Sequence, residues 1–228
     1  MAIVPRVDAW TRVRRELHRV QRFGLVVIDP VRAFTDPTGV IGQIHPAEQF
    51  GLILETVERL ASFAAVESGP KVWVTSLYAP GQFSEGDLDH PLAQLCADPS
   101  GDDCAWDPGL LPPADATVLT KTDLDAGSSP AFVEATEAMV GNVEALLITG
   151  FWLSACVAAT AASCGQRLAG RLPVVVPLSL AATRLGLYDP ADDHPAIVDV
   201  ATSLEALRAG GVVVCDAPDA WQTTLTGR

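Results

Sequence analysis

ALLITGFWLSACVAAT, residues 145–160, is the stretch of sequence that decides the fold class of this chain. Its first part is an apolar run that ends at a Thr-Gly pair, and its second part is a run of small residues. This order predicts a buried strand that turns into a helix, the unit of parallel α/β sheets. Cys156 lies where the helix is expected to begin. There the helix dipole and the backbone N–H groups would lower the pKa of the thiol and make it a nucleophile.

The same alternation of short apolar runs and longer amphipathic stretches continues along the chain. The predicted strands are Gly24–Asp29, Lys71–Tyr78, Ala116–Lys121, Leu146–Gly150, Pro173–Pro177 and Val212–Cys215. The predicted helices are Val7–Val20, Pro46–Ser68, Ser129–Val140, Ala155–Ala169 and Pro195–Ala209. The pattern predicts an α/β fold, a three-layer αβα sandwich around a mostly parallel six-stranded sheet.

The length of 228 residues suits a single domain that spans residues 1–228. Residues 1–22 are expected to form an N-terminal helical extension before the first strand. Residues 79–113 are rich in Gly, Pro and Asp, which predicts a long loop over the site.

Composition limits the partners and the compartment. The net charge of −13 argues against nucleic acid or an anionic membrane as the partner. The N-terminus lacks the apolar run of a signal peptide, and no stretch approaches the length of a membrane span. The five cysteines are odd in number and lack C-x-x-C spacing, which favours thiols over disulfides or metal sites. We therefore expect a cytoplasmic protein that acts on a small molecule.

Three chemically capable residues come at the ends of predicted strands. Asp29 follows GLVVI, Lys121 follows ATVLT, and Cys156 comes shortly after ALLITG. Because sites in open α/β sheets form at the carboxyl ends of strands, these side chains are expected to converge. Lys121 is one of only two lysines among fifteen basic residues, and the other, Lys71, opens its strand at the wrong end. Taken singly, each residue also has an ordinary interpretation, as a turn residue, a surface lysine or a core cysteine.

The order of these residues resembles that of the isochorismatase-like cysteine hydrolases. The matching segments are VVIDPVRAF (Val26–Phe34), VLTKTDLDAG (Val118–Gly127) and TGFWLSACVAAT (Thr149–Thr160). The resemblance implies a catalytic triad of Asp29, Lys121 and Cys156. In it, the aspartate takes the thiol proton, the lysine holds the carboxylate and favours the thiolate, and the cysteine attacks the substrate.

The resemblance also implies details around the nucleophile. The Phe151–Trp152 peptide is expected to be cis, and the N–H groups of Trp152 and Cys156 are expected to form an oxyanion hole. The chain departs from the family at Val31, where glutamine is common, and at Asp125–Gly127, where many members have Ser-Ala-Phe. The candidate substrate-binding residues are the aromatic residues Phe34, Tyr78, Trp106, Phe151 and Trp152.

A metal is not expected. Members of the nicotinamidase type carry an Asp-x-His pair and a further histidine after the second strand to hold zinc. This chain has TSLYAPGQFSEGDLDH there, with His90 as its one histidine, and its other histidines are scattered without ligand spacing. The sequence therefore predicts no metal and no cofactor.

The thiol itself indicates the class of bond that is cleaved. Hydrolysis of the vinyl ether of isochorismate needs only protonation and water, whereas a cysteine nucleophile suits an amide, lactam or ureido bond. We expect a cofactor-independent hydrolase that cleaves a C–N bond through a thioester-type intermediate.

The acidic composition suits a basic substrate, and some family members open natural-product or antibiotic amides and lactams such as streptothricin. The alternatives are an isochorismate-type ether hydrolase and a non-catalytic binding member of the fold. The family further implies a homodimer or homotetramer.

Overall fold

The computed structural model describes residues 22–43, 50–182 and 196–215. The predicted helix Val7–Val20 lies outside these ranges, as does all of the N-terminal extension except Arg22.

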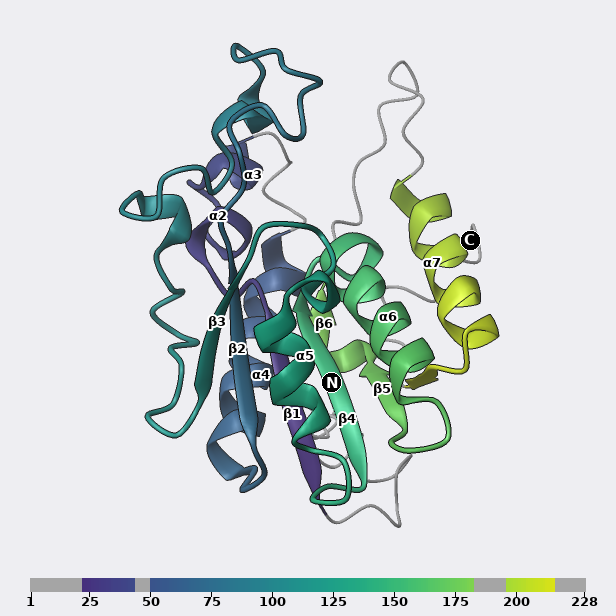
Figure 1. The fold of residues 1–228 in the computed structure, drawn as a ribbon. Helices are drawn as coiled ribbons and strands as arrows, with labels where there is room; N and C mark the ends of the chain where they lie inside the picture. The colour runs from purple at the N-terminus through teal and green to yellow at the C-terminus, as the bar shows by residue number, and fades with distance from the viewer. Residues whose placement is uncertain (1–21, 44–49, 183–195, 216–228) are drawn as a thin grey trace, which may run out of the picture.

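A parallel sheet forms the centre of the molecule (Figure 1). Its strands are β1 (Phe23–Ile28), β2 (Lys71–Ser76), β3 (Thr117–Lys121), β4 (Ala145–Phe151), β5 (Val174–Pro177), β6 (Ala181–Ala182) and β7 (Val213–Cys215). They lie in the order β3-β2-β1-β4-β5-β7, with β6 beside β4, and each of these pairings is parallel. The six strands predicted from sequence are all present, with shifts at their ends.

Strand β6 was missed by the prediction. After β5 the chain makes a single 3-10 turn, Leu178–Leu180, and then pairs again with β4 at Gly150 and Phe151. Two residues are too few to give a periodic pattern in the sequence. The described part of the chain therefore forms a seven-stranded sheet rather than a six-stranded one.

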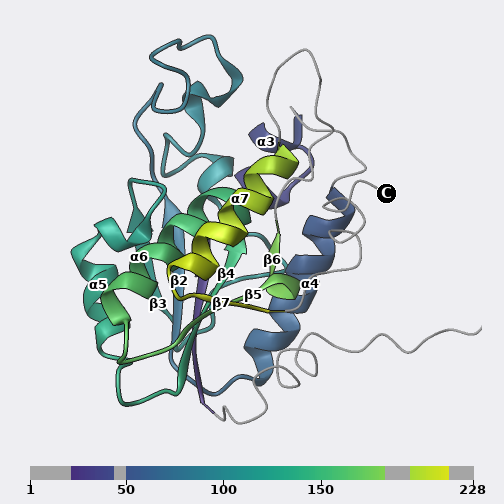
Figure 2. The ribbon, with the colours of Figure 1, turned by 90° about the vertical axis from the view of Figure 1, so that its right-hand side faces the viewer.

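Helices cover both faces of the sheet. They are α2 (Arg32–Thr35), α3 (Val40–Gln43), α4 (Phe50–Val66), α5 (Pro130–Glu137), α6 (Ala158–Leu168) and α7 (Ala196–Ala209). Helix α4 lies on one face, and α5, α6 and α7 lie on the other (Figure 2). The predicted αβα sandwich is confirmed. None of the helices in the described ranges is long and apolar enough to cross a membrane.

The core is divided between the two faces, because successive side chains of a strand point to opposite sides. In β1, Leu25 and Val27 pack on the α4 side, whereas Val26 and Ile28 pack on the side of α5, α6 and α7. All six residues of β1 are buried. Burial on both faces explains why the strands are continuous apolar runs in the sequence. Each large apolar side chain that is fully buried stabilises the fold by roughly 1.5–3 kcal/mol.

The carboxyl ends of β1 and β4 are held in close contact by Gly150. This residue has φ +105°, and a Cβ atom built on it would lie 2.2 Å from the carbonyl oxygen of Ile28. Only glycine fits there, which explains the Thr-Gly pair of the opening stretch. The order β3-β2-β1-β4 also reverses the direction of winding between β1 and β4, the position at which open α/β sheets form their sites.

Residues 79–113 carry little regular structure apart from 3-10 turns at Pro91–Gln94 and Asp102–Cys104. An isolated antiparallel bridge between Val31 and Trp106 ties the segment to the end of β1. The segment also contributes side chains to the pocket described below.

Candidate active site

The three residues of the expected triad meet at the carboxyl edge of the sheet. Asp29 directly follows β1 and has φ +51°, Lys121 is the last residue of β3, and Cys156 lies in a π-helical turn, Leu153–Val157, after β4. Single π turns occur often at functional sites because they redirect side chains. The ends of two strands thus position the two charged groups, and the turn after the Thr-Gly pair positions the thiol.

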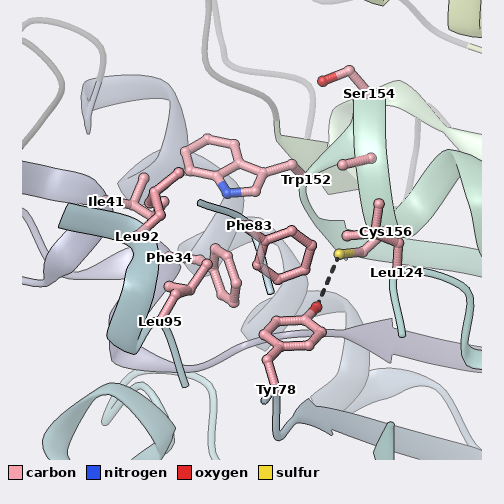
Figure 3. Close-up of a pocket in the computed structure, with 11 residues that line it drawn as sticks. Phe34, Ile41, Tyr78, Phe83, Leu92, Leu95, Leu124, Trp152, Ser154 and Cys156 are labelled. Atoms are coloured by element: carbon pink, nitrogen blue, oxygen red, sulfur yellow. Dashed lines mark hydrogen bonds between the residues drawn. The ribbon is translucent and has the colours of Figure 1, made fainter. Parts of the chain in front are cut away.

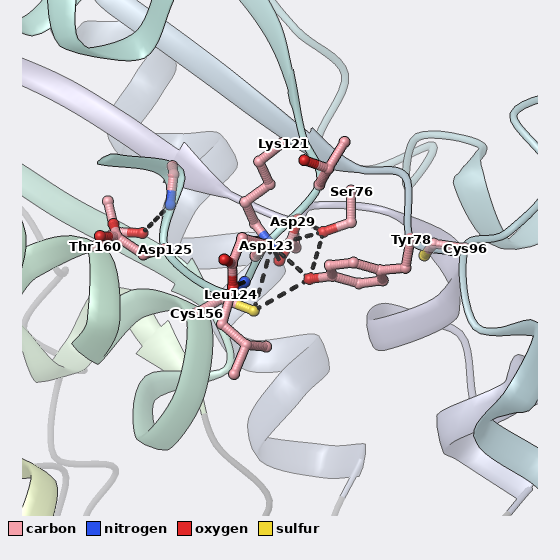
Figure 4. Close-up of polar contacts among 12 residues, drawn as sticks. Asp29, Ser76, Tyr78, Cys96, Lys121, Asp123, Leu124, Asp125, Cys156 and Thr160 are labelled. Atoms are coloured by element: carbon pink, nitrogen blue, oxygen red, sulfur yellow. Dashed lines mark hydrogen bonds and ion pairs between the residues drawn. The ribbon is translucent and has the colours of Figure 1, made fainter. Parts of the chain in front are cut away.

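Lys121 is the centre of the cluster (Figure 4). Its Nζ atom lies 3.0 Å from Asp29 Oδ2, and both side chains are completely buried. The same ammonium donates to Ser76 Oγ at 2.7 Å, to the hydroxyl of Tyr78 and to Cys156 Sγ at 3.4 Å. A fifth contact, of 3.1 Å, reaches the carbonyl oxygen of Asp123. The lysine therefore bridges the carboxylate and the sulfur.

Asp29 is oriented from one side only. Ser76 Oγ donates to Asp29 Oδ1 at 2.7 Å. Oδ2 faces Lys121, but in the described residues no donor is aligned with it for a directed hydrogen bond. A lone pair of the carboxylate therefore remains for a proton, which is what a general base requires.

The backbone around the nucleophile has the expected cis peptide. The Phe151–Trp152 bond is cis. Beyond it, the carbonyl oxygen of Trp152 accepts hydrogen bonds from the N–H groups of Ala155 and Val157, on either side of the Cys156 amide. The roles of the Trp152 and Cys156 amides as an oxyanion hole stay a prediction.

The pKa of Cys156 is raised rather than lowered, which corrects the expectation from a helix start. Burial, and after it the negative charge of Asp29, raise the pKa of the thiol, Lys121 opposes both, and the pKa that results is about 12. Burial alone would lower the pKa of Lys121, but the nearby Asp29 and Cys156 outweigh it and the pKa is raised. At neutral pH the cluster therefore holds an ammonium and a protonated thiol.

A cavity of about 210 Å³ opens beside the sulfur (Figure 3). Its lining is mostly apolar and aromatic: Phe34, Ile41, Tyr78, Phe83, Leu92, Leu95, Leu124, Trp152, Ser154, Ala155 and Cys156. Trp152 packs edge-on against Phe34, with 6.3 Å between ring centroids, and Tyr78 packs edge-on against Phe83 at 4.7 Å. The residues described here put no charged side chain on this wall.

Three of the five candidate substrate-binding residues line this cavity: Phe34, Tyr78 and Trp152. Phe151 is completely buried in β4 and packs in the core on the α4 side. Trp106 packs against the same core, beside Val31. A strand residue directly before the turn points into the sheet's core, so adjacency to the nucleophile in sequence was a poor guide to contact with the pocket.

Sequence reasoning missed Ser76 and the polar role of Tyr78. Ser76 ends β2, where its hydroxyl contacts both Asp29 and Lys121. The one signal in the sequence was a hydroxyl residue at the carboxyl end of a strand, the position that had singled out Asp29 and Lys121. The hydroxyl of Tyr78 lies 3.6 Å from Cys156 Sγ.

Metal-ligating residues do not cluster in the described ranges: no group of three or more His, Cys, Asp or Glu side chains there is placed to hold an ion. His90 is exposed and accepts a hydrogen bond from the N–H of Leu92. The other three histidines, His18, His45 and His194, lie outside the described residues.

A sequence model of the isochorismatase domain matches residues 24–176, more than half of the chain. The chain belongs to the isochorismatase family. No curated protein sequence matches it significantly.

Solved structures support the family fold. Pyrazinamidase of Pyrococcus horikoshii, solved in complex with zinc, aligns over 86% of this chain and 100% of its own, with 17% identity and a TM-score of 0.63. A cysteine hydrolase from Pseudomonas syringae pv. phaseolicola aligns over 91% of this chain and 94% of its own, with 17% identity and a TM-score of 0.62. N-carbamoylsarcosine amidase from Thermoplasma acidophilum aligns over 87% of this chain and 99% of its own, with 18% identity and a TM-score of 0.58. Identities this low establish the fold of this isochorismatase-family chain and not its substrate.

Proposed function

We propose that this protein is a cysteine hydrolase that cleaves a C–N bond of a small, uncharged molecule. The contact of Lys121 with both Asp29 and Cys156 carries the proposal, together with the place of Cys156 on the wall of an apolar cavity. A buried ion pair costs desolvation energy, and burying it beside a thiol serves no evident packing purpose. Similar structures that are named amidases support an amide-type bond.

The proposed reaction begins with transfer of the Cys156 thiol proton to Asp29 as the substrate enters. The thiolate attacks the carbonyl carbon, and the N–H groups of Trp152 and Cys156 stabilise the oxyanion. The C–N bond breaks as Asp29 returns the proton to the leaving amine, and a thioester remains on Cys156. Water then attacks the thioester, with Asp29 accepting its proton, and the thiol is restored. Lys121 stays protonated and offsets the negative charge at each stage.

The lining of the cavity supports an apolar acyl group. Aromatic and aliphatic side chains surround the sulfur, and a charged substrate would lose its hydration there without a described partner. Five aspartates of residues 79–113 could attract a basic substrate, but they do not line this cavity: Asp87, Asp89, Asp102, Asp103 and Asp107. A streptothricin-type antibiotic amide thus has less support than a compact neutral amide, lactam or ureido compound.

Release of amine from a panel of such compounds tests the proposal. The panel contains aromatic and branched aliphatic amides, a lactam, an N-carbamoyl compound, a streptothricin and isochorismate. We expect turnover of at least one neutral C–N substrate by the wild type, and its loss in Cys156→Ala. Cys164→Ala is the matched control, because that cysteine is buried two helical turns further on, beside Arg167.

The two alternatives give different results in the same assay. Hydrolysis of isochorismate that survives in Cys156→Ala would identify an ether hydrolase in which Asp29 acts without the thiol. A binding member would turn over nothing, and contact of the triad beside a cavity argues against that alternative. The cytoplasmic location and a homodimer or homotetramer remain proposals from composition and family.

A further inference from the structure

Two hydroxyl groups link the thiol of Cys156 to Oδ1 of Asp29, in addition to the direct interaction of the thiol with that carboxylate (Figure 4). The Tyr78 hydroxyl is 3.6 Å from Cys156 Sγ and 2.8 Å from Ser76 Oγ. Ser76 Oγ is in turn 2.7 Å from Asp29 Oδ1. All four side chains are buried, so the path is shielded from solvent.

Donor counting fixes the direction of this path. Lys121 can only donate, and it donates to both hydroxyl oxygens. Ser76 has one hydrogen and two neighbouring acceptors, and a carboxylate can only accept, so that hydrogen goes to Asp29. The tyrosine is then the donor in its bond with the serine. One lone pair of the Tyr78 hydroxyl then remains, and the Cys156 thiol, 3.6 Å away, can donate its hydrogen to it.

We propose that Tyr78 and Ser76 form a proton relay between Cys156 and Asp29, which makes Tyr78 a catalytic residue. The proton of Cys156 Sγ passes to the Tyr78 oxygen, the tyrosine hydrogen passes to Ser76 Oγ, and the serine hydrogen passes to Asp29 Oδ1. The products are a thiolate and a neutral carboxyl, with both hydroxyl groups restored. The same path in reverse returns the proton for the leaving amine. This proposal rests on the proposed function for its nucleophile and base.

Lys121 suits such a relay because its Nζ contacts every member. Its distances to Asp29, Ser76 and Cys156 are 3.0, 2.7 and 3.4 Å, and it also donates to Tyr78. Negative charge that develops on any of the four groups during the transfer is therefore offset by one fixed ammonium. Its position 4.8 Å from the centre of the Tyr78 ring adds a cation–π contact that holds the ring in place.

Acylation by p-nitrophenyl acetate tests the relay without knowledge of the natural substrate. Attack by Cys156 requires loss of the same thiol proton, and each acylation releases one nitrophenolate as a burst. We expect Tyr78→Phe and Ser76→Ala each to slow the burst about 10²-fold, the size of a general acid–base contribution. Because the two residues act in series, the double variant should be no slower than the slower single variant.

Thr75→Val is the matched control. It removes a buried hydroxyl next to Ser76 that has no hydrogen-bond partner in the described residues, so its burst should stay within about twofold of the wild type. Tyr78→Phe keeps the ring that packs against Phe83, which separates loss of the hydroxyl from loss of the pocket wall. A proton inventory in mixtures of H₂O and D₂O should be curved for the wild type, where several protons move, and linear for Tyr78→Phe.

The outcomes separate the two proposals. A burst of unchanged rate in Tyr78→Phe, or a linear inventory in the wild type, overturns the relay and leaves direct transfer to Asp29. A wild-type burst that depends on Tyr78, in an enzyme that releases amine from no compound of the panel, keeps the relay and overturns the proposed function. Both proposals are overturned if the wild type shows no burst, or if its burst remains in Cys156→Ala.

Discussion

The resting state of Cys156 leads to a quantitative prediction for its alkylation. With a pKa of about 12, the thiol is a thiolate in roughly one molecule in 10⁴ at pH 8, whereas a cysteine of ordinary pKa near 8.5 is about one-quarter ionised. Since the thiolate is the nucleophile, iodoacetamide should alkylate Cys156 about 10³-fold more slowly in the folded protein than in the unfolded chain. The rate should rise about tenfold per pH unit from pH 7 to pH 11.

Peptide mapping by mass spectrometry gives the rate for Cys156 separately from the other cysteines. The same peptide alkylated in guanidinium chloride provides the unfolded control, which should level off above pH 9. A folded-state rate that is already constant between pH 7 and pH 8 would show a depressed pKa. It would refute the reasoning that burial and Asp29 outweigh Lys121, and would restore the expectation of a helix-activated thiolate.

Two substitutions, each with a matched control, and one hydrodynamic measurement test the fold and the assembly. Lys121→Met should lower the free energy of unfolding in urea by about 3–5 kcal/mol, because it leaves Asp29 buried without its counter-charge. Lys71→Met is the control, because Lys71 is buried but its partner Asp115 is exposed. It should lower the free energy of unfolding clearly less than Lys121→Met, and an equal decrease would contradict this explanation. Gly150→Ala should lower the melting temperature by several degrees, since its Cβ would collide with the backbone of β1, whereas Gly141→Ala meets only open space. If both substitutions lower the melting temperature equally, the loss comes from backbone strain at positive φ and not from the close contact with β1. Light scattering should give the mass of a dimer or tetramer, and a monomer would contradict that expectation.

The sheet and the triad could be predicted because each depends on a local pattern. Strands buried on both faces are apolar throughout, and the functional side chains follow directly at their ends. Asp29, Lys121 and Cys156 were therefore found from strand ends alone, with the family resemblance supplying their roles. Strand β6 could not be found, because its two residues pair with β4 through the tertiary fold and leave no period in the sequence.

The electrostatics of the site could not be predicted in the same way. A helix start favours a thiolate, but the pKa of Cys156 is decided by how deeply the sulfur is buried and by which charge lies nearer. Both depend on packing between segments far apart in the chain. The same limit applies to Tyr78, which the sequence presents as one more aromatic residue and the fold places against the nucleophile.

Intact-protein mass spectrometry after rapid quenching tests the central claim most directly. The wild type, mixed with a neutral amide from which it releases amine, should gain the mass of the acyl group alone, and the adduct should map to Cys156. Asp29→Asn should form little or none of it, because the thiol proton then has no acceptor. Turnover at the wild-type rate in Cys156→Ala, with no acyl adduct in the wild type, would contradict a thioester pathway at this site.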